Sequence, residues 1–243
     1  MSALIVEVVF VIDASGSMKP CFEGLARHLE DFLRPLQGFK FKIRLGLLAM
    51  NVGADDGGGR VFDVTTLTGD LDTIYDAEQE EDIFTESPDI FLSRLRAVSL
   101  EGDENNLIAL DMALDFPFGP SGRTRRVVAM FSDEPIEDGA VEDCEIARIP
   151  EIIKKIGDRR VLLFAAMPNS PALEVLASAD ASHVQPVAGG DGLGSVDFGK
   201  LMGQMAKSIS AASIQGAEAP YQRALFGQDR WGESSGYSFD NMR

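Results

Sequence analysis

Apolar positions at the start of the chain follow first a strand pattern and then a helix pattern. Residues 3–12 form a nearly continuous run of apolar, mostly β-branched residues, which is typical of a strand buried on both faces. Apolar residues then recur at helical spacing until Gly38. They are Cys21, Phe22, Leu25, Leu29, Phe32, Leu33 and Leu36. We therefore expect a buried strand followed by an amphipathic helix.

A hairpin is predicted next. Residues 40–50 alternate between polar and apolar positions and then become apolar, and residues 60–66 form a second strand-like segment. Between them, residues 55–59 are rich in Asp and Gly, which favour tight turns. The two strands should therefore be antiparallel neighbours.

Helical and strand patterns alternate through the rest of the chain. The predicted helices are 88–98, 105–115, 150–156, 171–179 and 198–212, and the predicted strands are 125–131, 160–166 and 183–187. Residues 69–81 are acidic and weakly periodic, which indicates a loop. Such alternation predicts an α/β fold: a doubly wound, mostly parallel central sheet, Rossmann-like, flanked by helices and with one antiparallel edge strand.

The sequence shows no internal repeat and no second α/β unit, which indicates one domain over residues 1–213. Residues 214–243 form a tail rich in Gly, Ser, Asp and Gln, as in disordered segments. The tail also carries five aromatic residues: Tyr221, Phe226, Trp231, Tyr237 and Phe239. Aromatic side chains bury large apolar areas, so the tail either packs back on its own domain or docks on a partner.

Charge narrows the classes of partner. The chain has 39 acidic and 22 basic residues, a formal net charge of −17. Nucleic acids and anionic lipids are bound through clustered Lys and Arg, so neither is an expected partner. Basic proteins and divalent cations are favoured instead.

The sequence shows neither a targeting or membrane-spanning segment nor a cysteine motif. The N-terminus has no basic segment, Glu7 interrupts its apolar run, and no apolar run approaches the roughly 18 to 20 residues that span a bilayer. Cys21 and Cys144 form neither a disulfide framework nor a metal-binding pair and are expected to be unpaired thiols. We therefore expect a cytoplasmic, soluble protein.

Candidate chemistry lies where strands end. The first strand ends on Asp13, and Ser15 and Ser17 follow at alternate positions; Asp133 follows the strand at 125–131. In open α/β sheets the loops at the carboxyl ends of the strands meet, so these side chains should converge. Hydroxyl and carboxylate oxygens are the ligands that Mg²⁺ prefers. The competing interpretation is a simple helix cap, with Ser17 ahead of Pro20.

The segment D-A-S-G-S (13–17) after an apolar strand resembles the D-x-S-x-S signature of the von Willebrand factor A (vWA) family, whose domains carry a metal-ion-dependent adhesion site (MIDAS). The resemblance is to the intracellular bacterial type. It implies that Asp13, Ser15, Ser17 and Asp133 bind Mg²⁺, or Mn²⁺ or Ca²⁺ in its place. Glu134 stands where the family usually has the glycine of T-D-G.

A further ligand in many vWA domains is a threonine in a G-G-T-x-T loop. This chain has no such threonine; it has E-G-D-E-N-N-L-I-A-L at 101–110. Glu104 falls at the equivalent distance before the helix, which is similar to the integrin β subunits. Glu104 is therefore the expected fifth metal residue, with Asp103 as the competitor.

The resemblance implies a function in binding and not in catalysis. A vWA domain of this kind is expected to be a cytoplasmic adaptor in a multi-protein assembly, often with an AAA+ or MoxR-type ATPase, in which a partner protein offers a carboxylate to the metal. The rival is a Mg²⁺-dependent phosphohydrolase with Asp13 as nucleophile. Phosphatases of the haloacid dehalogenase type need a second aspartate two residues later, where this chain has Ser15.

Three other features are given structural interpretations. His28 is expected on a helix surface and His183 at a strand edge, neither as a ligand. The acidic run at 76–82 lacks the glycine and spacing of an EF-hand and should be a solvated loop. The glycine-rich segment at 189–194 does not fit a dinucleotide-binding turn and should be a flexible connection.

Overall fold

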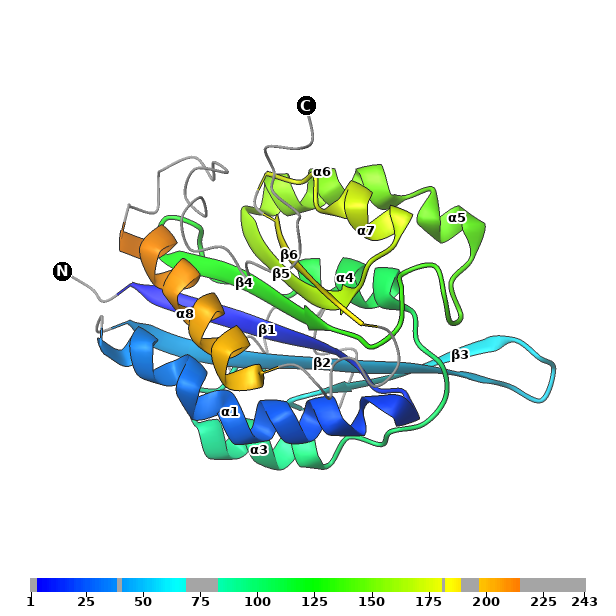
Figure 1. The fold of residues 1–243 in the computed structure, drawn as a ribbon, viewed down its shortest axis with the longest axis horizontal. Helices are drawn as coiled ribbons and strands as arrows, with labels where there is room; N and C mark the ends of the chain where they lie inside the picture. Colours follow the sequence, from blue (N-terminus) through cyan, green and yellow to red (C-terminus); the bar gives the residue numbers. More distant parts are fainter. Residues whose placement is uncertain (1–3, 39–40, 69–82, 181, 189–196, 215–243) are drawn as a thin grey trace.

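A computed structural model of the chain describes residues 4–38, 41–68, 83–180, 182–188 and 197–214. Its centre is a six-stranded sheet in the order β3-β2-β1-β4-β5-β6 (Figure 1). The strands are β1 (Ile5–Asp13), β2 (Lys42–Ala54), β3 (Arg60–Thr66), β4 (Thr124–Phe131), β5 (Val161–Pro168) and β6 (Ser182–Val187). Neighbouring strands are parallel except β2 and β3, which are antiparallel. The predicted fold class is confirmed.

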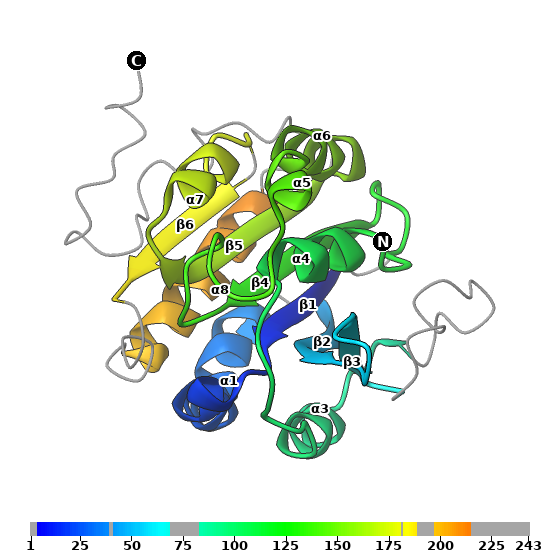
Figure 2. The same cartoon turned by 90° about the vertical axis from the view of Figure 1, so that its right-hand side faces the viewer.

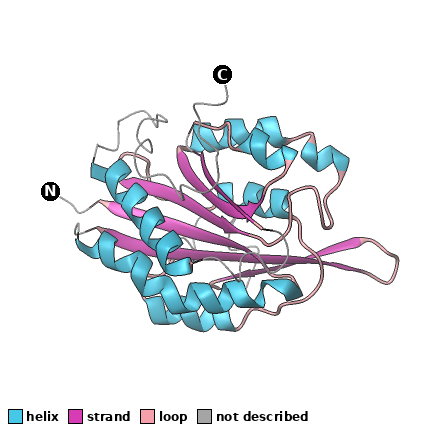
Figure 3. Ribbon diagram, in the orientation of Figure 1, coloured by secondary structure: helices cyan, strands magenta, loops and turns pink. Residues whose placement is uncertain are grey.

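Helices cover both faces of this sheet. They are η1 (Gly16–Met18), α1 (Lys19–Gly38), α3 (Pro88–Arg96), α4 (Asn106–Leu114), α5 (Asp143–Ile146), α6 (Ile149–Arg159), α7 (Pro171–Leu176) and α8 (Phe198–Ile214). Viewed along the strands, α1, α3 and α8 lie on one face, and α4, α6 and α7 on the other (Figure 2). Figure 3 shows the strands in magenta with helices in cyan on both sides of them. The described part of the chain contains no helix long and apolar enough to cross a membrane.

The predicted elements differ from the observed ones mainly in length. β2 runs past residue 50 to Ala54, and α6 extends to Arg159. α5 was not predicted, because its four residues lie in an acidic segment without apolar periodicity; the helix is held instead by a capping box between Glu142 and Glu145. The predicted loop at 69–81, the solvated run at 76–82 and the connection at 189–194 lie outside the described residues, as does the tail from residue 215 onward.

β1 lies at the centre of the hydrophobic core. Val6 and residues 8–12 are at most 1% exposed, as expected for a strand covered on both faces. The ring of Phe10 lies 5.2 Å from that of Phe91, 5.7 Å from Phe32 and 6.4 Å from Phe131. One strand residue therefore contacts α1, α3 and the neighbouring strand β4, which binds the sheet to its helical layer.

Glu7 is the exception in this strand, since it is fully buried among apolar residues. Its Oε1 accepts a hydrogen bond of 2.6 Å from Arg44, its register partner on β2, and its Oε2 accepts one of 2.8 Å from the Gly119 backbone. Burial raises the pKa of Glu7, and the Gly119 N–H and the Arg44 charge act against that rise. The buried carboxylate is thus satisfied, and it fixes the 116–120 turn to the sheet.

The two cysteines are free thiols, as predicted: Cys21 is buried and Cys144 is exposed. α1 and α8 pack closely because Gly24 has no side chain; a Cβ there would lie 2.7 Å from the Phe198 ring. His28 lies on α1, half-buried, with its Nδ1 2.8 Å from Asp31 Oδ2.

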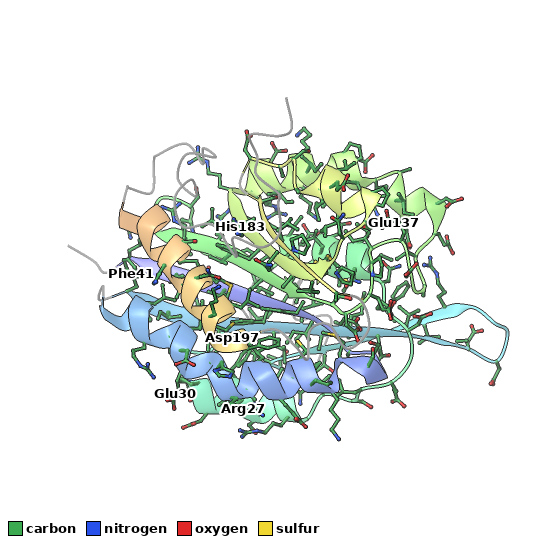
Figure 4. All side chains as sticks on the ribbon, viewed as in Figure 1. Arg27, Glu30, Phe41, Glu137, His183 and Asp197 are labelled. Carbon is green, nitrogen blue, oxygen red and sulfur yellow. The ribbon has the colours of Figure 1, made fainter. Side chains whose placement is uncertain are left out.

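His183 lies on β6, the edge strand of the sheet, where the sequence placed it, but its side chain is only 6% exposed (Figure 4). Its ring lies 6.0 Å from that of Phe164, its register partner on β5. Burial lowers the pKa of His183 to about 4, from an ordinary value of 6.5.

This burial predicts an acid-sensitive component of stability. Between pH 6.5 and 4 His183 is protonated in the unfolded chain but not in the folded one. The free energy of unfolding therefore decreases as the pH is lowered through this range. The loss between pH 7 and 4.5 should be roughly 2 kcal/mol. Denaturant unfolding of the parent and of His183→Phe at both pH values checks this, because the variant should lose less stability on acidification. Equal losses would show that His183 does not contribute.

Candidate functional site

The candidate site begins where β1 ends. Asp13 is the last residue of the strand and lies beside Met50 of β2. The pairing continues into the loop, because the Ala14 N–H donates to the Met50 carbonyl (2.9 Å). Asp13 then turns the chain: its Oδ1 accepts a hydrogen bond of 2.8 Å from the Ser15 N–H. The strand therefore delivers a buried carboxylate to the edge of the sheet, followed directly by a tight turn.

Four of the predicted residues come together at this edge. Ser15 Oγ lies 3.1 Å from Ser17 Oγ, and Ser17 Oγ donates a 3.1 Å hydrogen bond to Asp133 Oδ1. Asp13, Ser15 and Asp133 are buried, whereas Ser17 is exposed. Around an octahedral Mg²⁺ with oxygens at about 2.1 Å, neighbouring ligand oxygens lie roughly 3.0 Å apart. Both 3.1 Å spacings are close to that value.

The helix-cap interpretation of the serines is wrong. Ser15 stands at the cap position of η1, but its side chain makes no capping hydrogen bond, and Ser17 lies within the 3₁₀ turn. The Ser17 hydroxyl instead contacts residues of the cluster, including Asp133, 116 positions away in the sequence. A tertiary contact, and not a helix cap, therefore holds the Ser17 hydroxyl, and the Ser15 hydroxyl contacts Ser17.

Two further residues support the cluster and were missed by the sequence reasoning. Ser132 is fully buried, and its Oγ donates to Asp13 Oδ2 (2.9 Å). Ser132 Oγ in turn accepts from Asn106 Nδ2 at the start of α4 (3.0 Å). This chain of hydrogen bonds, from Asn106 through Ser132, holds the Asp13 carboxylate in place. The only sequence features that could have indicated this support are the Ser-Asp pair after β4 and the Asn-Asn pair at the start of α4.

Glu104 is buried beside the cluster but makes no hydrogen bond to it within the described residues. Its backbone carbonyl accepts from the Ala140 N–H (2.8 Å). Gly139 has φ +73°, and a Cβ at that position would lie 2.5 Å from Glu104 Oε1. The carboxyl of Glu104 thus contacts the loop after β4. Asp103, the competing residue, is exposed and pairs with Val52 of β2 through two backbone hydrogen bonds.

Carboxylates dominate the electrostatics of the site. Burial, the charge of Asp13 and the carboxyl of Asp103 together raise the pKa of Glu104 to about 8. Burial also raises the pKa of Asp13 and of Glu134, and every charged neighbour that contributes to these shifts is acidic. No three His, Cys, Asp or Glu side chains of the described residues are grouped closely enough to hold a metal by themselves. A metal at this edge therefore requires the serine hydroxyls.

A second hydrogen-bond network lies next to Glu104. Arg60 of β3 donates to the Ala140 carbonyl (2.6 Å) and to both carboxylate oxygens of Glu145 (3.0 and 3.1 Å). Asn105, the N-cap of α4, donates to the same carbonyl (3.0 Å) and to Glu145 (2.9 Å). The hairpin, the loop after β4 and the start of α4 are thereby joined next to Glu104.

Comparison with known proteins identifies the fold and not the function. No protein-family model matches the sequence, and no curated protein matches it at a significant level. The solved structures that match include the SpRpn10 VWA domain, with a TM-score of 0.52 and 16% identity over 82% of this chain and 95% of that one. A von Willebrand factor type A protein from Catenulispora acidiphila has a TM-score of 0.51 and 14% identity over 85% of this chain and 43% of that one.

Proximal thread matrix protein 1 from the mussel byssus also matches, with a TM-score of 0.51 and 14% identity over 84% of this chain and 46% of that one. The described architecture is therefore that of a vWA-like α/β fold. At these identities the likeness concerns the fold alone.

The position of Glu104 can be tested through Gly139. Gly139→Ala should destabilise the protein twice over: an L residue at positive φ costs about 1–2 kcal/mol, and the new methyl group would displace the Glu104 carboxyl. Gly58→Ala is the matched control, because Gly58 has φ +79° with nothing within 4 Å of an added Cβ. Denaturant unfolding should show a loss at least 1 kcal/mol larger for Gly139→Ala. Equal losses would contradict the observed packing of Glu104.

Proposed function

We propose that this chain is a divalent-metal-dependent protein-interaction module. The observation that carries the proposal is the cluster of three oxygens from Ser15, Ser17 and Asp133, whose neighbouring members lie 3.1 Å apart, with Asp13 buried beside them. The residues that would hold the ion are Ser15 and Ser17 through their hydroxyls, and Asp13 and Asp133 through carboxylates. Mg²⁺ is the expected ion, since hard oxygen ligands suit it; Mn²⁺ and Ca²⁺ are the alternatives.

The charge balance supports a cation at this position. Burial raises the pKa values of Asp13, Glu104 and Glu134. The charge of Asp13 raises those of Glu104 and Glu134 further, and the charge of Asp133 raises that of Asp13, which means that each carboxylate is also disfavoured by its neighbours. A bound dication supplies positive charge that offsets this repulsion and offers a coordination position to an outside ligand. Glu104 contributes a further carboxylate next to the ion, as its sequence position suggests.

A partner protein that places a carboxylate on the ion is the expected ligand. Ser17 is exposed whereas Asp13 and Asp133 are buried, so the cluster is open to an approaching side chain on the Ser17 side. Placement in a cytoplasmic assembly, and an AAA+ or MoxR-type ATPase as its partner, are proposed from the sequence resemblance alone.

Metal binding can be tested by removing the two hydroxyls. The parent should bind one Mg²⁺ or Mn²⁺ per chain in calorimetric titration, and Ser15→Ala with Ser17→Ala should bind it at least tenfold more weakly. Each lost ligand removes one of about six oxygens from the ion. The control is Ser93→Ala with Ser178→Ala, which removes two exposed hydroxyls elsewhere and should keep the parental affinity. Unchanged affinity in the first variant would place any metal elsewhere.

The rival function, phosphohydrolysis with Asp13 as nucleophile, is not favoured by the geometry. Both oxygens of Asp13 already accept hydrogen bonds, from the Ser15 N–H and the Ser132 hydroxyl. Ser15 at the second position cannot act as an acid or base near neutral pH. With Mg²⁺ present, we therefore expect no turnover of an aryl phosphate that depends on Asp13. Turnover that disappears in Asp13→Asn would overturn the binding function.

A further inference from the structure

The β2–β3 hairpin projects beyond the rest of the sheet on the side of the candidate metal site (Figure 1). Met50 of β2 lies beside Asp13, the last residue of β1, and β2 continues for four more residues to Ala54. β3 pairs with β2 along its whole length, from Ala54↔Arg60 to Leu48↔Thr66. β3 is also the end strand of the described sheet, so its outer edge has no neighbouring strand there.

The direction of the backbone groups on β3 follows from two hydrogen bonds of β2. The N–H and C=O of Val52 both bond to Asp103, on the side of β2 that faces away from β3. In an antiparallel ladder, bonded and non-bonded pairs alternate, so Val52↔Phe62 is a non-bonded pair. The N–H and C=O of Phe62 therefore point outward. Those of Val64, two residues further along, point outward as well.

Among the described residues, the outer edge is bonded at one end and not at the other. At Thr66 the outward carbonyl accepts a 2.8 Å hydrogen bond from Arg94 Nε of α3. At Phe62 and Val64 no described residue bonds to the outward groups. Pro, Lys and β-bulges commonly protect an edge strand from pairing. β3 contains no Pro or Lys, and its register with β2 is continuous, without a bulge.

We propose that the outer edge of β3 is a docking site for an extended, basic segment of a partner protein, which adds to the sheet as a further antiparallel or parallel strand. The outward N–H and C=O groups of Phe62 and Val64 provide the main-chain hydrogen bonds of such an addition. On the exposed face of the strand, Val61 is 47% exposed and offers an apolar contact, and Asp63 offers a negative charge.

The negative charge along the hairpin favours a basic partner segment. Asp55, Asp56 and Asp63 are all exposed along the hairpin. The one basic residue of β3, Arg60, is already bound to Glu142 and Glu145. Lysine or arginine beside Asp63 would form a favourable cross-strand pair. A second copy of this chain would bring another net charge of −17 to the same edge, so a basic partner is favoured over self-association.

Amide hydrogen exchange of the parent protein provides the first test. The amides of Phe62 and Val64 should exchange quickly in the free protein, whereas those of Val61, Asp63 and Thr65, which face β2, should exchange slowly. The probe is an acetylated and amidated nine-residue peptide in which Lys alternates with Val and Thr. Its addition should slow exchange at Phe62 and Val64 at least tenfold. Unchanged exchange at millimolar peptide would overturn the proposal.

Two substitutions at Val64 isolate the backbone donor. Val64→Pro removes the outward N–H without removing a bond to β2, and Val64→Ala keeps this N–H while shortening the side chain. The peptide should bind Val64→Pro at least tenfold more weakly than Val64→Ala. Equal binding would contradict the proposal. If Val64→Pro does not fold, the exchange measurement on the parent decides the matter.

Two further outcomes separate this site from other possibilities. Peptide binding should be the same with and without a chelator, because the edge of β3 uses no metal; failure of the metal site would therefore leave this result unchanged. Sedimentation of the parent should show a monomer. A dimer that Val64→Pro dissociates would identify a second copy as the occupant and overturn the basic partner.

Discussion

The pairing of β1 between β2 and β4 is the constraint on which the rest of the structure depends. Because both faces of β1 are covered by helices, nearly all of its residues are apolar, and its register with its neighbours is fixed by the core. A slip by one residue would move the core side chains of the strand to the opposite face. The same register places Asp13 at the end of the strand, within reach of Ser132. The packing of the core therefore positions the candidate site.

The candidate site concentrates negative charge in a buried place, which is unfavourable for the folded chain. Hydrogen bonds to Asp13 from the Ser15 N–H and the Ser132 hydroxyl offset part of this cost. The pKa values of Asp13 and Glu104 remain raised, first by burial and then by the neighbouring carboxylates, so part of this cost remains. Proteins tolerate such costs where the site has a use, and a cation is the simplest group that would remove this one.

Two kinds of recognition are proposed at the same end of the sheet. The hydroxyls and carboxylates after β1 and β4 suit an ion and a partner's carboxylate, and the edge of β3 suits an extended segment. Arg60 connects them, since it lies on β3 and contacts both the Ala140 carbonyl and Glu145, next to Glu104. A partner that used both surfaces would gain affinity from each without a change in either.

The sequence by itself predicted the order of the strands and of the longer helices, the hairpin, and the convergence of Asp13, Ser15, Ser17 and Asp133. It could do so because the continuous apolar run before Asp13 and the alternation at Ser15 and Ser17 are local patterns. A strand of a parallel sheet that ends on a carboxylate places that group at the carboxyl ends of the strands, whatever the details of packing.

Only the tertiary structure decided the rest, because those features depend on contacts between residues distant in sequence. Ser132 bonds to Asp13 across 119 positions, and Arg60 bonds to Glu145 across 85, and neither pairing leaves a periodic pattern. The side chain of Glu104 turns toward Gly139 because that loop has a glycine at positive φ. The outward direction of the Phe62 and Val64 backbone groups, to which no described residue bonds, follows from which side of β2 faces Asp103. A strand pattern specifies which residues face the core, but the order of strands in the sheet specifies which edge is left open.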